Sequence, residues 1–114
     1  KSGYELASAL IGSGRAFTAI ICTNDMMAFG AISALQQAGL RVPQDVSVVG
    51  IDDIMFSKDF YPSLTTLSHR AELFGERVFQ ILYDNIADKS LVEREIIKPE
   101  LIVRNSTAAP KTGR

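Results

Sequence analysis

Two short apolar runs on either side of a helical pattern constrain the fold of this chain more than any other feature. The runs cover 17–22 and 46–51; both are too short for a buried helix, and the second is rich in β-branched residues. Between them, apolar residues recur every three or four positions up to Gly39, a residue type that commonly ends helices. The pattern therefore predicts a strand–helix–strand unit with parallel strands and a right-handed crossover.

The remaining pattern extends this unit into one α/β domain, which is what 114 residues can form. Residues 4–11 have helical periodicity and end at a glycine-rich turn. The strongest helix covers 70–87, where six apolar residues share one face: Ala71, Phe74, Val78, Ile81, Leu82 and Ile86. We also expect one helical turn in the loop 52–63, extended segments at 64–68, 95–98 and 101–103, and a flexible tail over 108–114. Alternating strands and helices predict a layered α/β fold with a parallel sheet.

Charge and cysteine content exclude several classes of protein. Twelve lysines and arginines stand against thirteen acidic residues, a net charge of −1, which argues against a surface that wraps nucleic acid. The single cysteine, Cys22, excludes an intramolecular disulfide and favours a reducing compartment. No apolar stretch reaches the roughly 18 residues of a membrane span, and no signal peptide is visible. We therefore expect a cytoplasmic protein that does not associate with membranes.

Residue types for catalysis or metal binding are scarce. His69 is the only histidine and Cys22 the only cysteine, so the sequence indicates neither a nucleophile–base pair nor a metal site rich in His or Cys. Asp52 and Asp53, followed later by Lys98, are similar to the pattern of phosphoacceptor receiver domains, but the third acidic residue at an intervening strand end is missing. We expect no enzymatic activity, no cofactor and no metal.

Polar residues follow both strands of the predicted unit. Asn24 and Asp25 follow the first strand, and Asp52 and Asp53 follow the second. In open parallel sheets, ligands bind beyond the carboxyl ends of the strands. Asparagine both donates and accepts hydrogen bonds, and an ionised aspartate accepts them from adjacent hydroxyls such as those of a sugar. The alternative is structural, because Asn and Asp after a strand also cap helices and form turns.

Four segments carry fixed combinations of unrelated residue types: Cys-Thr-Asn-Asp-Met-Met-Ala-Phe-Gly-Ala at 22–31, Gly-Leu-Arg-Val-Pro-Gln-Asp-Val-Ser-Val-Val-Gly-Ile-Asp-Asp at 39–53, Pro-Ser-Leu-Thr-Thr-Leu at 62–67 and Pro-Glu-Leu-Ile-Val-Arg-Asn-Ser-Thr at 99–107. In these segments the chain closely resembles the lac repressor/galactose repressor family of bacterial transcription regulators. The resemblance implies that residues 1–107 are the C-terminal part of an effector-binding core, one lobe of a type I periplasmic-binding-protein-like fold.

The same resemblance implies what lies outside this chain. The family has an N-terminal helix-turn-helix that binds DNA, and neither it nor most of the first lobe has a counterpart here. Lys1 is then an internal position of a longer natural protein, and the helix 70–87 belongs against the missing lobe. Without that lobe, we expect the apolar face of the helix either to fold back on its own sheet or to be buried by a second copy.

Site residues are implied only where single positions match the family. Asn24 and Asp52 match ligand-contacting positions, and His69 stands where sugar-responsive members often carry glutamine. His69 is therefore either at the rim of the ligand site or an ordinary exposed residue of the crossover. Phe29, Phe56 and Phe60 fall where the family makes its dimer contact, although they could instead be core residues.

The function implied is the effector-sensing and dimerisation part of a bacterial transcription regulator. Its partners would be a sugar or related small metabolite, a second copy in a homodimer, and DNA through the absent helix-turn-helix. The mechanism implied is closure of two lobes around the ligand, which changes the placement of the DNA-binding heads. The alternative is a periplasmic sugar-binding protein of a transporter, which shares the two-lobed fold.

Overall fold

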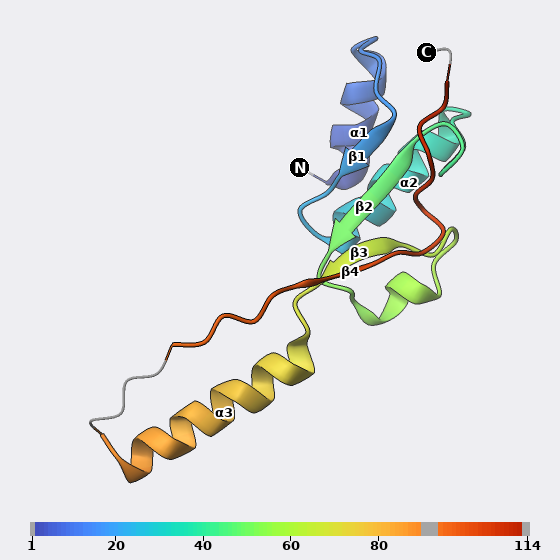
Figure 1. The fold of residues 1–114 in the computed structure, drawn as a ribbon. Helices are drawn as coiled ribbons and strands as arrows, with labels where there is room; N and C mark the ends of the chain where they lie inside the picture. The colour runs from blue at the N-terminus through green and yellow to red at the C-terminus, as the bar shows by residue number, and fades with distance from the viewer. Residues whose placement is uncertain (1, 90–93, 113–114) are drawn as a thin grey trace.

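The computed structural model describes residues 2–89 and 94–112 (Figure 1). The elements follow in the order α1 (Gly3–Gly12), β1 (Ala19–Ile21), α2 (Asp25–Gln37), β2 (Ser47–Ile51), the 3-10 helix η1 (Met55–Lys58), β3 (Thr65–Ser68), α3 (Ala71–Ala87) and β4 (Glu100–Ile102). This order confirms the strand–helix–strand unit and the single helical turn predicted within the loop 52–63.

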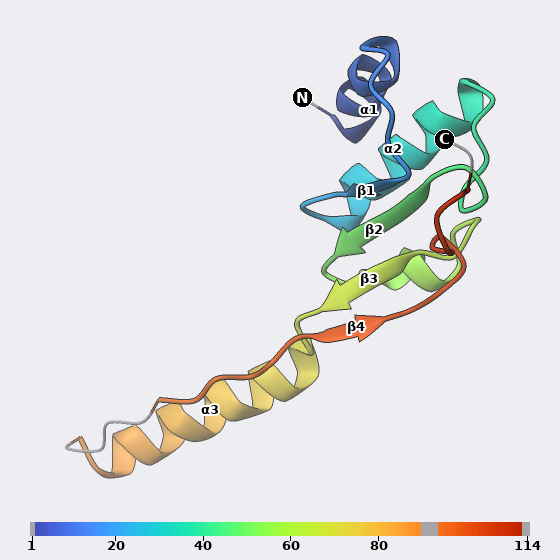
Figure 2. The same cartoon turned by 45° about the horizontal axis from the view of Figure 1, so that its top comes forward.

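The four strands form one sheet in the order β1-β2-β3-β4. β1 pairs with β2 and β2 with β3 in parallel, as predicted, whereas β3 pairs with β4 antiparallel. Figure 2 shows the arrowheads of β2 and β3 pointing the same way and that of β4 pointing back. The strand predicted at 95–98 is wrong: these residues lie beyond the sheet, where no neighbouring strand can pair with them, and they run beside α3 (Figure 2).

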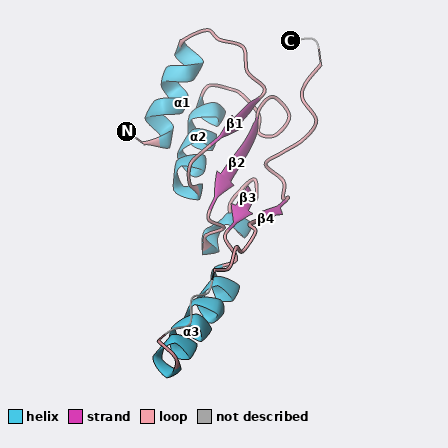
Figure 3. Ribbon diagram, turned by 60° about the vertical axis from the view of Figure 1, so that its left-hand side comes forward, coloured by secondary structure: helices cyan, strands magenta, loops and turns pink. Residues whose placement is uncertain are grey.

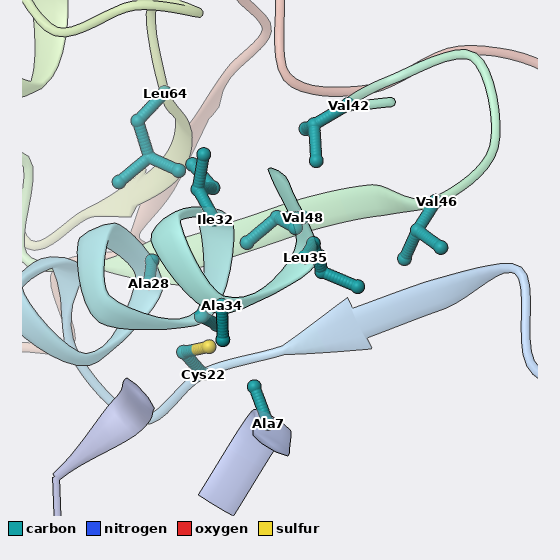
Figure 4. Close-up of a cluster of buried hydrophobic side chains, with 11 residues drawn as sticks. Ala7, Cys22, Ala28, Ile32, Ala34, Leu35, Val42, Val46, Val48 and Leu64 are labelled. Atoms are coloured by element: carbon teal, nitrogen blue, oxygen red, sulfur yellow. The ribbon is translucent and has the colours of Figure 1, made fainter. Parts of the chain in front are cut away.

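The core lies between α2 and the sheet. The largest fully buried apolar side chains come from α2, from β2 with the residue before it, and from the loop before β3 (Figure 4): Ile32, Leu35, Val46, Val48 and Leu64. α1 and α2 pack side by side (Figure 3). A Cβ atom at Gly3 would clash with the backbone of α2, and one at Gly30 would clash with the backbone of α1. The two glycines therefore allow the helices to approach closely.

α3 projects from the sheet with the returning segment 94–99 beside it; together we call them the arm (Figures 1 and 2). The arm gives the molecule extents of 60 × 26 × 24 Å and a radius of gyration of 18.5 Å, against about 13 Å for a compact domain of roughly this size. No residue of α3 is buried, and the side chains of Phe74 and Val78 are 55% and 39% exposed. Folding of the helix back on its own sheet is therefore wrong for this chain; burial by a second copy stays a prediction.

The chain returns from the arm through β4 into residues 104–111, which we call the C-terminal strap. Ser106 of the strap is fully buried beside β2 and β3. Its Oγ accepts a hydrogen bond from the Thr65 N–H (2.8 Å) and donates one to the Val48 carbonyl oxygen (2.6 Å). The strap thus fastens two neighbouring strands near their amino-terminal ends.

The predicted flexible tail is attached over most of its length. Ala108 exchanges hydrogen bonds with the side chain of Ser47, and the Lys111 Nζ lies 2.8 Å from Asp45 Oδ1. The Arg41 guanidinium donates two hydrogen bonds to the same carboxyl group and holds its pKa well below the usual range, and Lys111 adds to this effect. No local pattern indicates the attachment of the tail, because Ser47 and Asp45 lie 61 and 66 residues before their partners Ala108 and Lys111. Residues 113–114 of the predicted tail lie outside the described residues.

Candidate ligand-binding site

The three predicted ligand residues follow the ends of three neighbouring strands. Asn24 comes after β1, Asp52 directly after β2, and His69 directly after β3. Because β1, β2 and β3 are parallel neighbours, their carboxyl ends meet at one edge of the sheet, and the three residues lie along that edge. This is the position at which open parallel sheets bind ligands.

Asp52 and His69 contact each other at this edge. The distance from Asp52 Oδ1 to His69 Nε2 is 3.5 Å, and their side chains are 47% and 61% exposed. The backbone N–H of Asp52 donates to the Leu67 carbonyl oxygen of β3 at 2.9 Å, which fixes the residue at the sheet. An exposed carboxylate with one imidazole neighbour can accept hydrogen bonds from the hydroxyl or amino groups of a small molecule.

The backbone is strained where these carboxylates stand. Asp52 has a φ of 112° and Asp53 a φ of 53°, in a region that residues with a Cβ atom rarely adopt. Such conformations persist only where the surrounding structure holds them, and they concentrate at functional sites. The strain is therefore a second observation, independent of the strand-end position, that points to this loop.

The adjacent aspartates have different roles. Asp53 Oδ1 accepts a hydrogen bond from Arg104 Nη2 at 2.8 Å, and Arg104 Nη1 also donates to the Leu64 carbonyl oxygen. Both charged side chains of this pair are mostly buried, so Asp53 is occupied by a structural partner. Within the described part of the chain, Asp52 forms no ion pair with a lysine or arginine, and its side chain remains about half exposed. The strand-end rule alone does not separate the two carboxylates, whereas the family resemblance implies a ligand contact for Asp52 only.

Asn24 caps α2, which was the structural alternative for this residue. Its Oδ1 accepts a hydrogen bond from the Met27 N–H at 2.8 Å. The capping bond uses one of the two lone pairs of the side-chain oxygen, so a ligand could still contact the other lone pair or the Nδ2 group. Of the three predicted residues, the structure brings Asp52 and His69 into contact. Asn24 lies on the same edge, where it caps α2.

Two grooves flank the contact between Asp52 and His69. One, of about 450 Å³, includes Asp52 together with Ser68, Arg70 and Glu100 in its lining. The other, of about 410 Å³, includes His69 and the first turns of α3. Asp52 and His69, which contact each other, thus each line one groove where the sheet meets the arm.

The three phenylalanines predicted at the dimer contact lie on one surface. Phe29 and Phe60 are half-buried and stack with ring centroids 4.3 Å apart, and they line a groove of about 320 Å³ with Phe56 and Met26. We call these four residues the aromatic surface. Phe29 and Phe60 also pack against the core, which was the structural alternative, whereas Phe56 is 65% exposed. Met26 was missed, although it lies three residues before Phe29 and so on the same face of α2.

One buried residue of this region was underestimated from the sequence. Asp25, predicted from the sequence either as a polar strand-end residue that faces a ligand or as a helix cap, is fully buried and is hydrogen-bonded to Ile54, Ser57 and Thr66. Its partners lie 29 to 41 residues away in the chain, so no local pattern reveals them. Among residues 2–89 and 94–112, no group of three or more His, Cys, Asp and Glu side chains could hold a metal ion. In the same described residues, no helix is long and apolar enough to span a bilayer.

These features define a class of protein: an α/β lobe with polar residues at the carboxyl ends of three parallel strands. A family model described as periplasmic binding protein-like domain matches residues 2–107, and the chain belongs to this family. The predicted fold, a partial lobe of the periplasmic-binding-protein type, is confirmed.

Similar proteins with established names are transcription repressors. The chain is 41% identical over 108 residues to the HTH-type transcriptional repressor PurR of Pasteurella multocida, an alignment that covers 93% of this chain and 32% of the relative. Identity to PurR of Haemophilus influenzae is 42% over 110 residues, covering 93% and 33%. The chain therefore spans about a third of the length of the curated relatives it matches.

Solved structures give the same result. The lac repressor dimer bound to operator and the anti-inducer ONPF superposes with a TM-score of 0.86 at 32% identity, covering 94% of this chain and 37% of that one. A LacI family regulator from Arthrobacter sp. FB24, in complex with lactose, gives a TM-score of 0.82 at 27% identity, covering 93% and 40%. The resemblance to the lac repressor/galactose repressor family is confirmed.

Proposed function

We propose that this chain is the effector-binding part of a bacterial transcription regulator that senses a sugar or related small metabolite. The observation that carries the proposal is the line of Asn24, Asp52 and His69 along one sheet edge, in a lobe similar to those of repressors. The net charge of −1 fits, because DNA contacts would come from a helix-turn-helix outside this chain. The named relatives favour a cytoplasmic, non-enzymatic regulator over a transporter's periplasmic binding protein.

The proposed mechanism is lobe closure at the junction between sheet and arm. The chain leaves the sheet after β3 and returns before β4, so the junction consists of two adjacent crossovers. Arg70, at the first crossover, has a left-handed backbone with a φ of 55°. A ligand held by Asp52 on this lobe and by residues of the missing lobe would favour the closed arrangement. Ligand affinity and DNA affinity would then be linked.

The ligand role of Asp52 is tested by calorimetry on the longer protein, with monosaccharides and disaccharides as probes and lactose first among them. A hydrogen bond to a charged group contributes about 1.5–3 kcal/mol. Asp52→Ala should therefore weaken binding about 10- to 100-fold while the fold survives. Glu76→Ala, which removes an exposed carboxylate from the arm, is the matched control and should bind as wild type. Unchanged affinity in Asp52→Ala refutes the site.

We also propose that the regulator is a homodimer joined through the aromatic surface. Aromatic residues and methionine are enriched in the cores of protein interfaces, and two-fold symmetry is the commonest arrangement of such contacts. Phe56→Asp should shift the sedimentation of the longer protein toward a monomer. Tyr61→Asp alters an aromatic residue that is more exposed than Phe56 and lines a different groove, and it should leave the dimer intact. A wild-type protein that sediments as a monomer at micromolar concentration would contradict the proposal.

A further inference from the structure

Asp25 is a fully buried carboxylate at the first residue of α2. Its Oδ2 accepts hydrogen bonds from the Ile54 N–H at 2.9 Å and from the Ser57 hydroxyl at 2.5 Å. Its Oδ1 accepts one from the Thr66 hydroxyl at 2.6 Å. Three donors from the loop after β2, from η1 and from β3 thus converge on one side chain. A carboxyl group that is fully buried needs hydrogen-bond partners of this kind.

The sheet is shaped to admit this carboxylate. A Cβ atom at Gly50 would clash with Asp25 Oδ1, so the glycine leaves the space that the side chain occupies. Gly50 stands in β2, two residues before Asp52. The approach of Asp25 to the strand is therefore built into the residues that lead to the ligand-binding edge.

The bonds of Asp25 extend to the strained loop on one side. Thr66 Oγ1, which donates to Asp25, lies 3.3 Å from the Asp53 N–H, which donates to it. Ile54 is held directly, so both residues that follow Asp52 are bonded to Asp25 or to its partner. Since the positive φ values of Asp52 and Asp53 need external support, Asp25 supplies part of that support.

The same carboxylate is connected to the aromatic surface through Ser57. Ser57 is fully buried in η1, next to the exposed Phe56. The hydroxyl of Ser57 is bonded to Asp25, and the Ser57 carbonyl oxygen accepts the Leu64 N–H at 2.8 Å. Release of this hydroxyl would loosen the turn that presents Phe56.

We propose that Asp25 is a positioning residue that places Asp52 at the ligand-binding edge and Phe56 on the aromatic surface. It touches neither the ligand nor the second copy and acts through Ile54, Thr66 and Ser57. The inference rests on the proposed function for the meaning of the two surfaces. The positions themselves are measurable without a ligand.

The test uses the imidazole of His69 as a reporter, because its Nε2 lies 3.5 Å from Asp52 Oδ1. NMR spectra of the longer protein give one signal that disappears in His69→Gln and so belongs to His69. Asp52→Asn then shows how far this signal moves when the neighbouring carboxylate is lost. Asp25→Asn and Thr66→Val should move the signal in the same direction, whereas Thr66→Ser, which keeps the hydroxyl, should leave it in place.

Ser57→Ala tests the connection from Asp25 to the aromatic surface separately. It should leave the His69 signal unchanged while amide hydrogen exchange across 55–60 becomes about tenfold faster, the effect of one lost hydrogen bond. A purely structural Asp25 would give variants of lower stability with an unmoved His69 signal in both Asp25→Asn and Thr66→Val, and that result overturns the inference. An unchanged ligand affinity in Asp52→Ala would refute the proposed function alone, since the His69 signal does not depend on ligand.

Discussion

Two regions of this chain have similar apolar content but differ in how much of it is buried. One region is the sheet with α1 and α2, and the other is the arm. α2 is 13 residues long and buries Ala28, Ala31, Ile32, Ala34 and Leu35, while α3 is 17 residues long and buries none. The apolar face of α3 is also wider than the predicted stripe, because Phe79 and Tyr83 extend it and stack on each other at 6.2 Å. An amphipathic pattern therefore indicates that one face of a helix packs against another segment, but it does not identify that segment.

The largest expected effect depends on whether that segment is present. In the 114-residue chain, Phe74→Ala should change the free energy of unfolding by no more than about 0.5 kcal/mol, as for other exposed positions. In the longer protein, where the first lobe is proposed to cover α3, the same change should cost about 3–5 kcal/mol. Urea denaturation of both proteins measures the two values. Equal small values would mean that nothing in the longer protein covers this face.

A substitution in the core beside the sheet should have the same effect in both proteins. Leu35 is fully buried between α2 and the sheet, so Leu35→Ala should cost about 2–5 kcal/mol. The loss should be the same in the short chain and in the longer protein, because all neighbours of Leu35 in the core cluster belong to this chain. A clearly larger loss in the longer protein would show that the sheet region also depends on the missing lobe.

The smallest expected effect concerns the C-terminal strap. The pKa of Asp45 is lowered by Arg41 and then by Lys111, so the carboxylate stabilises the fold at neutral pH. This contribution should be present above the ordinary carboxyl pKa of about 4 and lost as the pH falls further. Lys111→Met should reduce the difference in unfolding temperature between pH 7 and pH 3, while Lys58→Met on η1 should not. Identical pH dependence of Lys111→Met and wild type would show that the strap contact contributes nothing.

Local patterns predicted the parts of this protein that depend on neighbours in sequence. The two apolar runs gave β1 and β2, the caps gave the ends of α2, and the strand-end rule placed Asn24 and Asp52 on one edge. The strand expected at 95–98 failed because β structure needs a partner, which the sequence does not reveal. The attachment of Ala108 and Lys111 was missed for the same reason.

In the candidate site too, local patterns predicted some features and missed those that depend on distant residues. The contact of Asp52 with His69 comes from adjacent parallel strands and could be expected from strand order. The separate roles of Asp52 and Asp53 depend on Arg104, which lies 51 residues after Asp53. The convergence of three donors on Asp25 depends on residues of the loop after β2, of η1 and of β3, and it could be seen only in three dimensions.

The C-terminal strap has a consequence for the order in which this lobe forms during synthesis. Ser106 supplies the hydrogen-bond partners of Thr65 and Val48, residues made 41 and 58 positions earlier. When β1, β2 and β3 have been translated, the sheet therefore still lacks these partners. Contacts this distant in sequence form slowly, and exposed strands are then open to wrong pairing. The lobe reaches its complete hydrogen bonding only after the arm and the strap have both been made, which places this step of folding after the synthesis of residue Ser106.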